Sequence, residues 1–226
     1  MKKVLVVAAT TLEIDPFLQY LKASLGQKGN PLFGMNGYEI DVLITGVGIA
    51  NTAYRLGKAV ATKHYHFILN VGIAGSFKPD ILRGSVVEIM SEQYGDLGVE
   101  EADGTFTDIH ELNLIGSNEV PFIKAKLLNK KPLNIKKINK VSGLTVQKVH
   151  GFGISIASIV KKYNCDIETM EGAAVFKICL TEKIDFAQIR AISNHVEPRN
   201  RDNWQIKEAI ENLNKVVIEL FEKRII

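Results

Sequence analysis

The chain has 226 residues, of which 46% are hydrophobic and 23% charged, and these values exclude disordered, collagen-like and membrane-spanning classes. Its 28 basic and 25 acidic residues leave a formal net charge of +3, too small to indicate a nucleic-acid-binding or membrane-binding protein. The two cysteines, Cys165 and Cys179, form no Cys-x-x-Cys pair, which favours a reducing, cytoplasmic location.

The N-terminal segment predicts a buried strand. Lysines at positions 2 and 3 precede six apolar residues at 4–9, but this run is too short for a secretion signal and no small-residue cleavage site follows it. A continuous run of valine and leucine is typical of a strand that is buried on both faces.

Strands and helices then alternate along the chain. Apolar runs predict strands at 42–45, 67–71, 86–90, 166–169 and 186–192, and helical spacing predicts helices at 49–61, 154–163 and 170–180. The clearest helix is the last, over residues 206–221, with Asp202 or Asn203 as its N-cap. This alternation predicts one α/β domain over residues 1–226, with three layers and a largely parallel sheet flanked by helices.

Two stretches carry charge or possible metal ligands without indicating a function. Seven lysines fall within residues 124–140, which we interpret as a solvated surface helix and loop. His64 and His66 could contact a metal from one face of a strand, but no third ligand lies near them in the sequence. We expect no metal site there, and assign no role to His110, His150 or His195.

The glycine-rich turn at 45–48 half-matches a dinucleotide-binding motif. Thr-Gly-Val-Gly is followed by Asn51 where the motif has its third glycine, and no acidic residue ends a strand about twenty residues later. A tight turn between strand and helix is therefore favoured over a nicotinamide-cofactor site.

Two carboxylates are expected at the ligand-binding edge of the sheet. Glu13 lies just past the first strand, where it is either a binding residue or a charge in the first turn of a helix. Glu171 lies where a short strand runs into a helix rich in small residues. Two carboxylates at one edge suit chemistry that develops positive charge on a sugar, such as glycosidic cleavage.

These features resemble a known family, the purine nucleoside phosphorylase and nucleosidase superfamily, in its 5′-methylthioadenosine/S-adenosylhomocysteine nucleosidase-like branch. The motifs that carry this resemblance lie in the family's order at 6–13, 45–48, 70–75, 170–174 and 190–193. The segment at 192–201, followed by Trp204, is most similar to a hydrolase of that branch that releases hypoxanthine. The resemblance implies a homodimer with its active site near the subunit interface, and catalysis without a cofactor or metal.

The resemblance also implies roles for individual residues. Glu13 matches the residue that activates the attacking water, and Glu171 matches the one that binds the ribose hydroxyls, with Met170 packing against the sugar. Val146 and Gln147 match the segment that contacts the base. Gly72 lies in the glycine-containing motif at 70–75 and is expected at the substrate site.

Three positions depart from the adenine nucleosidases of this branch. Asn194 replaces the aspartate that protonates the leaving base, Thr169 replaces a frequent glutamate, and Ile73 replaces a common serine. An asparagine amide can donate a hydrogen bond toward N7 and O6 of a 6-oxopurine, whereas an ionised aspartate would repel O6. Asn194 therefore favours a 6-oxopurine, although asparagine can also pair with adenine.

The function expected from the sequence is hydrolysis of a purine nucleoside's N-glycosidic bond, with Glu13 and Asn194 as the catalytic residues. An adenine nucleosidase of the same fold is the first alternative. A non-catalytic nucleoside-binding protein is the second, because Asn194 removes the usual acid. A phosphorylase would need a pocket for the phosphate dianion, but residues 8–16 contain no basic residue.

Overall fold

The computed structural model describes residues 1–25, 33–135 and 138–226. Its helices are α1 (Thr11–Leu25), α2 (Ile49–Thr62), α3 (Gly153–Tyr163), α4 (Gly172–Thr181) and α5 (Ile206–Glu222), with a short 3-10 turn at Arg201–Asn203. Its main sheet contains β1 (Lys2–Ala8), β2 (Phe33–Met35), β3 (Tyr38–Ile44), β4 (Phe67–Ser76), β5 (Val86–Tyr94), β8 (Leu127–Leu128), β9 (Asn139–Thr145), β10 (Ile167–Thr169) and β11 (Asp185–His195). A separate hairpin is formed by β6 (Gly98–Glu100) and β7 (Phe106–Asp108).

The sheet is mixed and largely parallel, as the sequence predicts. Its strand order is β10-β9-β5-β11-β4-β1-β3-β2, with β8 on β5. The pairs β1–β3, β1–β4, β4–β11, β5–β9 and β9–β10 are parallel. Antiparallel pairing is confined to β2–β3, β5–β8, β5–β11 and β4–β10 among the named strands of this sheet.

Half of the sheet closes on itself. The far end of β4 pairs with β10 at Gly75 and Ser76, while β4 also pairs with β11 along its whole length. Because β11 pairs with β5, β5 with β9 and β9 with β10, these five strands form a ring. The ring brings the carboxyl ends of β4, β9, β10 and β11 close together.

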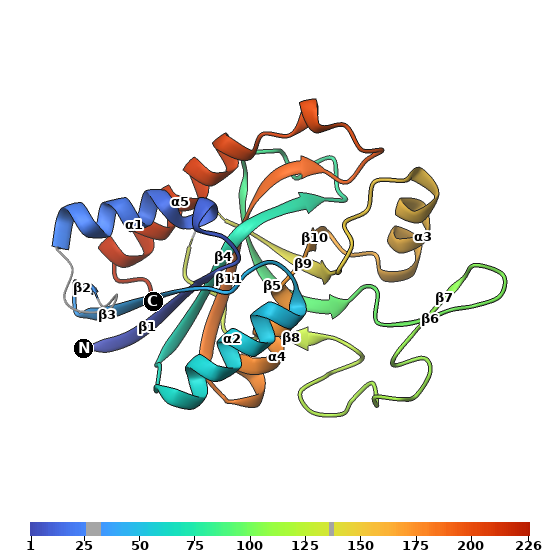
Figure 1. Cartoon of the computed structure of the whole chain (residues 1–226), viewed down its shortest axis with the longest axis horizontal. Coiled ribbons are helices and arrows are strands. Elements are labelled where there is room, and N and C mark those ends of the chain that lie inside the picture. The colour runs from blue at the N-terminus through green and yellow to red at the C-terminus, as the bar shows by residue number, and fades with distance from the viewer. Residues whose placement is uncertain (26–32, 136–137) are drawn as a thin grey trace.

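Helices cover both faces of the sheet (Figure 1). On one face α1 and α5 pack against each other, and on the other α2 packs against α4. Alternate residues of β1 serve the two faces, since Val4 and Val6 belong to the first core and Leu5 and Val7 to the second. This arrangement explains why the strand is apolar at every position.

The sequence predictions for the apolar strands and for four helices are confirmed, with ends shifted by a few residues. The predicted N-cap of the last helix is wrong. Asp202 and Asn203 lie in the preceding 3-10 turn, which Asn200 caps by accepting a hydrogen bond from the Asp202 N–H. Gln205 is the residue before α5 and makes no side-chain cap there.

The surface helix predicted within 124–140 is absent from the described part of that segment. Leu127 and Leu128 form β8 against β5 instead. Asn129 then fixes the chain by donating a hydrogen bond to the Phe186 carbonyl at 2.9 Å. Buried Leu127 and Leu133 hold this lysine-rich stretch against the sheet as extended chain.

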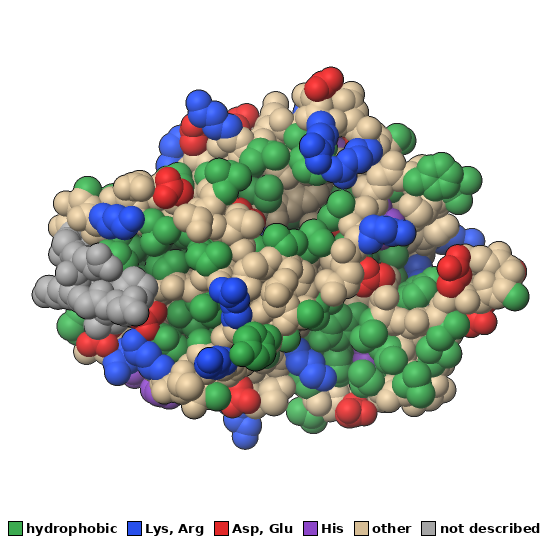
Figure 2. Space-filling model, viewed as in Figure 1, with side chains coloured by type: hydrophobic (Ala, Val, Ile, Leu, Met, Phe, Trp, Pro, Cys, Tyr) green, Lys and Arg blue, Asp and Glu red, His purple; other side chains and the backbone are tan. Residues whose placement is uncertain are grey.

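In the described residues, no helix is long and apolar enough to cross a membrane. On the face shown in Figure 2, acidic and basic side chains are interspersed among apolar and neutral ones.

Candidate active site

A cavity of about 350 Å³ lies at the carboxyl ends of the central strands. Its wall combines the segments after β1, β3, β9 and β10 with residues near the ends of β4, β10 and β11, Trp204, and the starts of α1 and α5. The lining residues are Ala9, Thr10, Leu12, Glu13, Val47, Ile73, Ala74, Gly75, Val149, His150, Glu168, Thr169, Met170, Glu171, Ser193, Asn194, Trp204, Ile206 and Ile210. Glu13, Met170, Glu171 and Asn194, which the sequence singles out, therefore share one cavity.

Glu13 lies in the first turn of α1 and is buried. One carboxylate oxygen, Oε2, accepts hydrogen bonds from the N–H and the hydroxyl of Thr10, both at 2.9 Å. The other, Oε1, accepts a hydrogen bond from the Ile73 N–H on β4 at 3.1 Å. The pair Thr10-x-x-Glu13 thus has the pattern of a helix capping box, which fixes the carboxylate at the cavity wall.

A buried arginine lies beside this carboxylate. Arg190, on β11, is 1% exposed and donates from Nη2 to the Asn70 side-chain oxygen at 2.7 Å. A Cβ atom added to Gly72 would lie 2.7 Å from Glu13 Oε1 and 3.1 Å from Arg190 Nη1. Gly72 is not among the residues that line the cavity, and its missing side chain leaves room for the Glu13 and Arg190 side chains.

Glu171 is the second buried carboxylate of the cavity. Its Oε1 accepts a hydrogen bond at 2.9 Å from the N–H of Gly48, the residue before α2, whose φ of 93° favours glycine. Burial raises the pKa of Glu171, while Arg190 and the Gly48 N–H lower it and the charge of Glu13 raises it further. The incomplete dinucleotide motif thus holds a carboxylate of the same protein.

Asn194 lies near the end of β11, where it pairs with Gly75 of β4. Its Oδ1 accepts from the Ser193 hydroxyl at 2.8 Å, and its Nδ2 donates to the His195 carbonyl at 2.9 Å. The pairing of β11 with β4 is irregular between Ile192 and Asn194, next to Gly75. A bulge of this kind re-aims side chains, here toward the cavity.

Val146 and Gln147 lie away from the cavity wall. Val146 is fully buried in a small apolar cluster with Leu144 and residues of α3. Gln147 is exposed, and its Oε1 accepts a hydrogen bond from the Ile49 N–H at the start of α2. Their expected contact with the base stays a prediction.

Sequence reasoning missed several polar residues of the site. Arg190 and Asn70 are the clearest, because a charged or amide side chain inside an apolar strand must find a buried partner. The same signal marks Glu92 on β5, which is fully buried and accepts hydrogen bonds from Thr145, Thr169 and Gln188. Burial raises the pKa of Glu92 to about 7.

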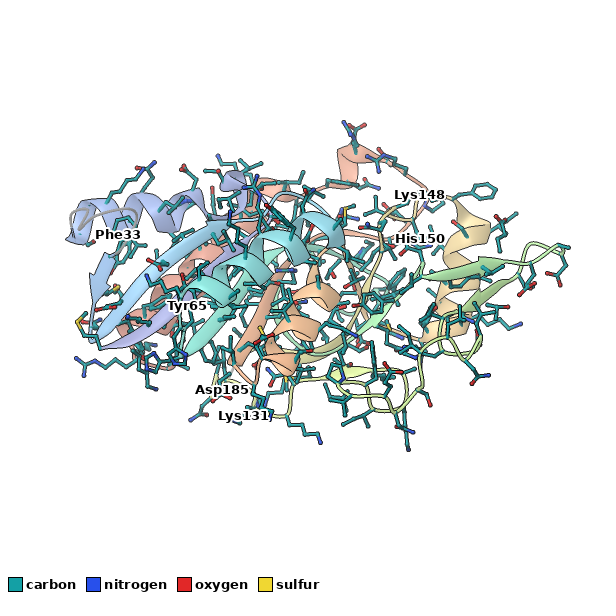
Figure 3. The ribbon with its side chains drawn as sticks, turned by 60° about the horizontal axis from the view of Figure 1, so that its bottom comes forward. Phe33, Tyr65, Lys131, Lys148, His150 and Asp185 are labelled. Carbon is teal, nitrogen blue, oxygen red and sulfur yellow. The ribbon has the colours of Figure 1, made fainter. Side chains whose placement is uncertain are left out.

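A histidine–carboxylate pair also lines the cavity. Glu168, on β10, is buried and forms an ion pair or hydrogen bond with Nδ1 of His150. The carboxylate also accepts the His150 N–H, with oxygen distances of 3.1 and 3.2 Å. Figure 3 places His150 and Lys148 on the loop between β9 and α3.

His64 and His66, considered above as metal ligands, lie with their ring centroids 5.1 Å apart. Within 1–25, 33–135 and 138–226, no three His, Cys, Asp or Glu side chains are placed to hold one ion. The ring of His66 instead accepts the Lys3 N–H through Nδ1 at 3.1 Å.

Comparison with known proteins gives a consistent group of relatives. No family model matches the chain. It is 26% identical over 203 residues to futalosine hydrolase of Thermus thermophilus, covering 83% of both chains. It is 29% identical over 186 residues to futalosine hydrolase of Streptomyces coelicolor, covering 80% of this chain and 77% of that one.

Solved structures share the fold over nearly the whole chain. A 5′-methylthioadenosine/S-adenosylhomocysteine nucleosidase from Neisseria meningitidis, in complex with methylthio-immucillin-A, superimposes with a TM-score of 0.79 at 18% identity and covers 99% of this chain and all of its own. Futalosine hydrolase of Helicobacter pylori gives 0.79 at 14% identity and 98% coverage of both chains. Three relatives matched by sequence are named futalosine hydrolase. The resemblance to the nucleosidase-like branch and its nucleoside phosphorylase-like fold, expected from the motifs, is confirmed.

Proposed function

We propose that this chain is an N-glycosyl hydrolase that splits futalosine into hypoxanthine and dehypoxanthine futalosine, a reaction of menaquinone biosynthesis. The observation that supports this proposal best is that Glu13, Glu171 and Asn194 line one cavity. The similarity to futalosine hydrolases from three organisms over 76% to 83% of this chain also supports this substrate.

In the proposed mechanism Glu13 is the base that activates water. The water oxygen attacks C1′ of the ribose, one water proton moves to Glu13, and the bond from C1′ to N9 breaks with its electron pair leaving on the purine. The Glu13 carboxylate that accepts this proton lies beside the buried Arg190. The Ile73 and Thr10 donors fix the orientation of this carboxylate.

Glu171 holds the sugar in this mechanism. A carboxylate that accepts hydrogen bonds from the 2′ and 3′ hydroxyls is favoured further as the ring gains oxocarbenium character. The Gly48 N–H occupies one oxygen of Glu171 and leaves the carboxylate with further acceptor positions for these hydroxyls. Met170, on the same cavity wall, packs against the ribose.

Water is favoured over phosphate as the attacking group. The basic residue Arg190 lies beside Glu13, but its guanidinium already donates to Asn70. A phosphate dianion entering here would meet the Glu13 carboxylate, whereas a neutral water would be oriented by it.

The carboxylate at the benzoate end of futalosine needs a cation, for which the sequence offers Arg199, Arg201 and several lysines. Arg199 is the best placed, because its guanidinium lies 5.2 Å from the ring of Trp204, which lines the cavity. An arginine fixed against an aromatic ring is ordered before it meets a carboxylate.

An adenine nucleosidase remains the second candidate, and the observation that favours it is the structural match to a 5′-methylthioadenosine/S-adenosylhomocysteine nucleosidase in complex with methylthio-immucillin-A. The deciding experiment incubates the purified protein with futalosine, 6-aminofutalosine and methylthioadenosine, with and without phosphate, and follows the free bases by chromatography. We expect hypoxanthine from futalosine at a rate that does not depend on phosphate.

Other outcomes assign other functions. Release of adenine without hypoxanthine would overturn the proposed substrate. A strict need for phosphate would make the chain a phosphorylase, and nucleoside binding without turnover would make it a binding protein.

A further inference from the structure

The cavity contains a feature that the proposed mechanism leaves unused. Glu168 and His150 form a buried pair on its wall, with side chains only 3% and 12% exposed. A carboxylate that binds Nδ1 of a histidine fixes the orientation of the ring and leaves Nε2 as the nitrogen that faces other groups. In the described parts of the chain, no protein group bonds to Nε2 of His150.

The position of the pair along β4 indicates which part of a nucleoside it meets. Glu168 pairs in register with Gly75 on one side of β4, and Asn194 pairs with Gly75 on the other side. Glu13 is bonded to Ile73, two residues earlier on the same strand, which corresponds to about 7 Å at the usual strand rise. A nucleoside whose sugar lies at Glu13 and whose base lies at Asn194 therefore presents that base to His150 as well.

The roles proposed above for Glu13, Glu171 and Asn194 leave the departing base without a proton donor. Asn194 donates a hydrogen bond but has no proton to transfer at neutral pH. A histidine held by a carboxylate is the side-chain arrangement most often used to transfer protons near neutral pH.

We propose that His150, oriented by Glu168, is the general acid that protonates the departing purine. The bond from C1′ to N9 breaks and its electron pair stays on the purine. The imidazolium form of His150, whose Nδ1–H stays hydrogen-bonded to Glu168, transfers its Nε2 proton to a ring nitrogen of the base and becomes neutral. The water oxygen bonds to C1′ and its proton moves to Glu13. Solvent then removes the proton from Glu13 and reprotonates His150, so that one water is consumed in each turnover.

This proposal rests on nucleoside hydrolysis as proposed above, and its test uses two leaving groups. Hypoxanthine needs a proton to depart, whereas 4-nitrophenolate, joined to the same 5′-substituted ribose, departs as a stable anion. For His150→Gln we expect kcat/KM for futalosine to fall roughly 10²–10⁴-fold while that for the nitrophenyl compound stays within about threefold. Glu168→Gln keeps an acceptor for Nδ1 but removes the charge, so we expect a smaller loss with the same dependence on the leaving group.

The matched control is His195→Gln. His195 is also half-buried and contacts the Ile81 carbonyl through Nε2 at 3.3 Å, but it does not line the cavity. We expect it to retain activity toward both substrates. A second measurement asks whether added imidazole restores futalosine hydrolysis to His150→Ala, which is expected of a missing proton donor.

The outcomes separate this proposal from the proposed function. An equal loss on both leaving groups, no loss at all, or a His150→Ala variant that imidazole does not restore would overturn the role of His150. Failure of the unmodified protein to hydrolyse any purine nucleoside would instead overturn the proposed function.

Discussion

Glu13 has both a structural role, in holding the start of α1, and a proposed chemical role as the base. Its Oε2 closes the first turn of α1 through Thr10, and its Oε1 is bound to the backbone of β4. The carboxylate is therefore held in place before a substrate arrives. A substitution that removes its charge but keeps an acceptor oxygen should leave the side chain in the same position.

The first prediction at this scale concerns Glu13→Gln. The amide oxygen can still accept the Thr10 N–H, so we expect the fold and nucleoside binding to persist, while kcat falls by roughly 10²–10⁴ because the base is lost. The measurement is kcat beside the nucleoside Kd from calorimetry. Asp15→Asn, on the same helix, is the control and should retain turnover, and a fully active Glu13→Gln would contradict the role of Glu13 as base.

A second prediction concerns the choice of base. In Asn194→Asp the new carboxyl can donate to N7 of a 6-aminopurine, but its ionised form repels O6 of hypoxanthine. We expect the ratio of kcat/KM for 6-aminofutalosine to that for futalosine to rise at least about tenfold, as one such hydrogen-bond pair discriminates by about 1–3 kcal/mol. An unchanged ratio would mean that position 194 does not choose the base.

The residues of the site were predictable to different degrees. The convergence of Glu13, Glu171 and Asn194 follows from their places at the ends of strands and from the resemblance. His150 was not predictable, because only the pairing of β10 with β4 brings Glu168 to the cavity. The positions of Val146 and Gln147 depend on how the loop after β9 folds over α3, which no local pattern specifies.

At the scale of elements, the start of α4 is notable because the backbone at Gly172 closely approaches the side chain of Glu92. Glu92 lies against the first turn of α4, where Thr145 accepts the Ala173 N–H and donates to the Glu92 carboxylate. A Cβ atom added to Gly172 would lie 1.9 Å from Glu92 Oε1 and 2.7 Å from Gln188 Nε2. The paired small residues that start this helix therefore provide room for a buried polar network.

Gly172→Ala tests that interpretation. We expect the free energy of unfolding to fall by at least about 1–3 kcal/mol, because the buried side chains around the new methyl group would have to move. Gly57→Ala, within α2, is the control with the opposite expected sign, since its Cβ meets nothing within 4 Å and alanine favours a helix by about 0.5–1 kcal/mol. Urea unfolding of both variants measures the difference, and equal effects would contradict the packing argument.

The elements that the sequence predicts best are those with a strong apolar period. The inner strands and α5 follow directly from that pattern. The helix α1 was not predicted, although Thr10 and Glu13 form a capping box, because Pro16 lies inside it. The lysine-rich segment was misassigned because its few buried leucines, rather than its many charges, determine its path.

At the scale of the whole molecule, Glu92 links stability to pH. Its pKa of about 7 in the folded protein lies above the ordinary value of 4.5. A raised carboxyl pKa gives stability that is complete below about pH 4.5 and is lost as the pH rises through 7, because the unfolded chain releases that proton first. We expect the Tm of the protein to fall between pH 5 and 8, and Glu92→Gln to reduce that fall. Equal pH dependence in both proteins would contradict this contribution of Glu92.

The oligomeric state is a further prediction for the whole molecule. The resemblance implies a homodimer with the site near the interface, and the cavity rim exposes Leu12 and Val47 at 66% and 48%. Light scattering after size exclusion should give twice the chain mass of 25.0 kDa. A monomeric mass at concentrations that support full activity would contradict the dimer.

The closed ring of β4, β11, β5, β9 and β10 has a consequence for how such proteins diverge. Each of these strands has a bonded neighbour on both sides, so none of them can slip by one residue without breaking two ladders. Insertions and substitutions in the loops at the carboxyl ends therefore change what lines the cavity without shifting the strands below it. Chains that share as little as 14% of their residues with this one can thus keep its backbone at a TM-score of 0.79.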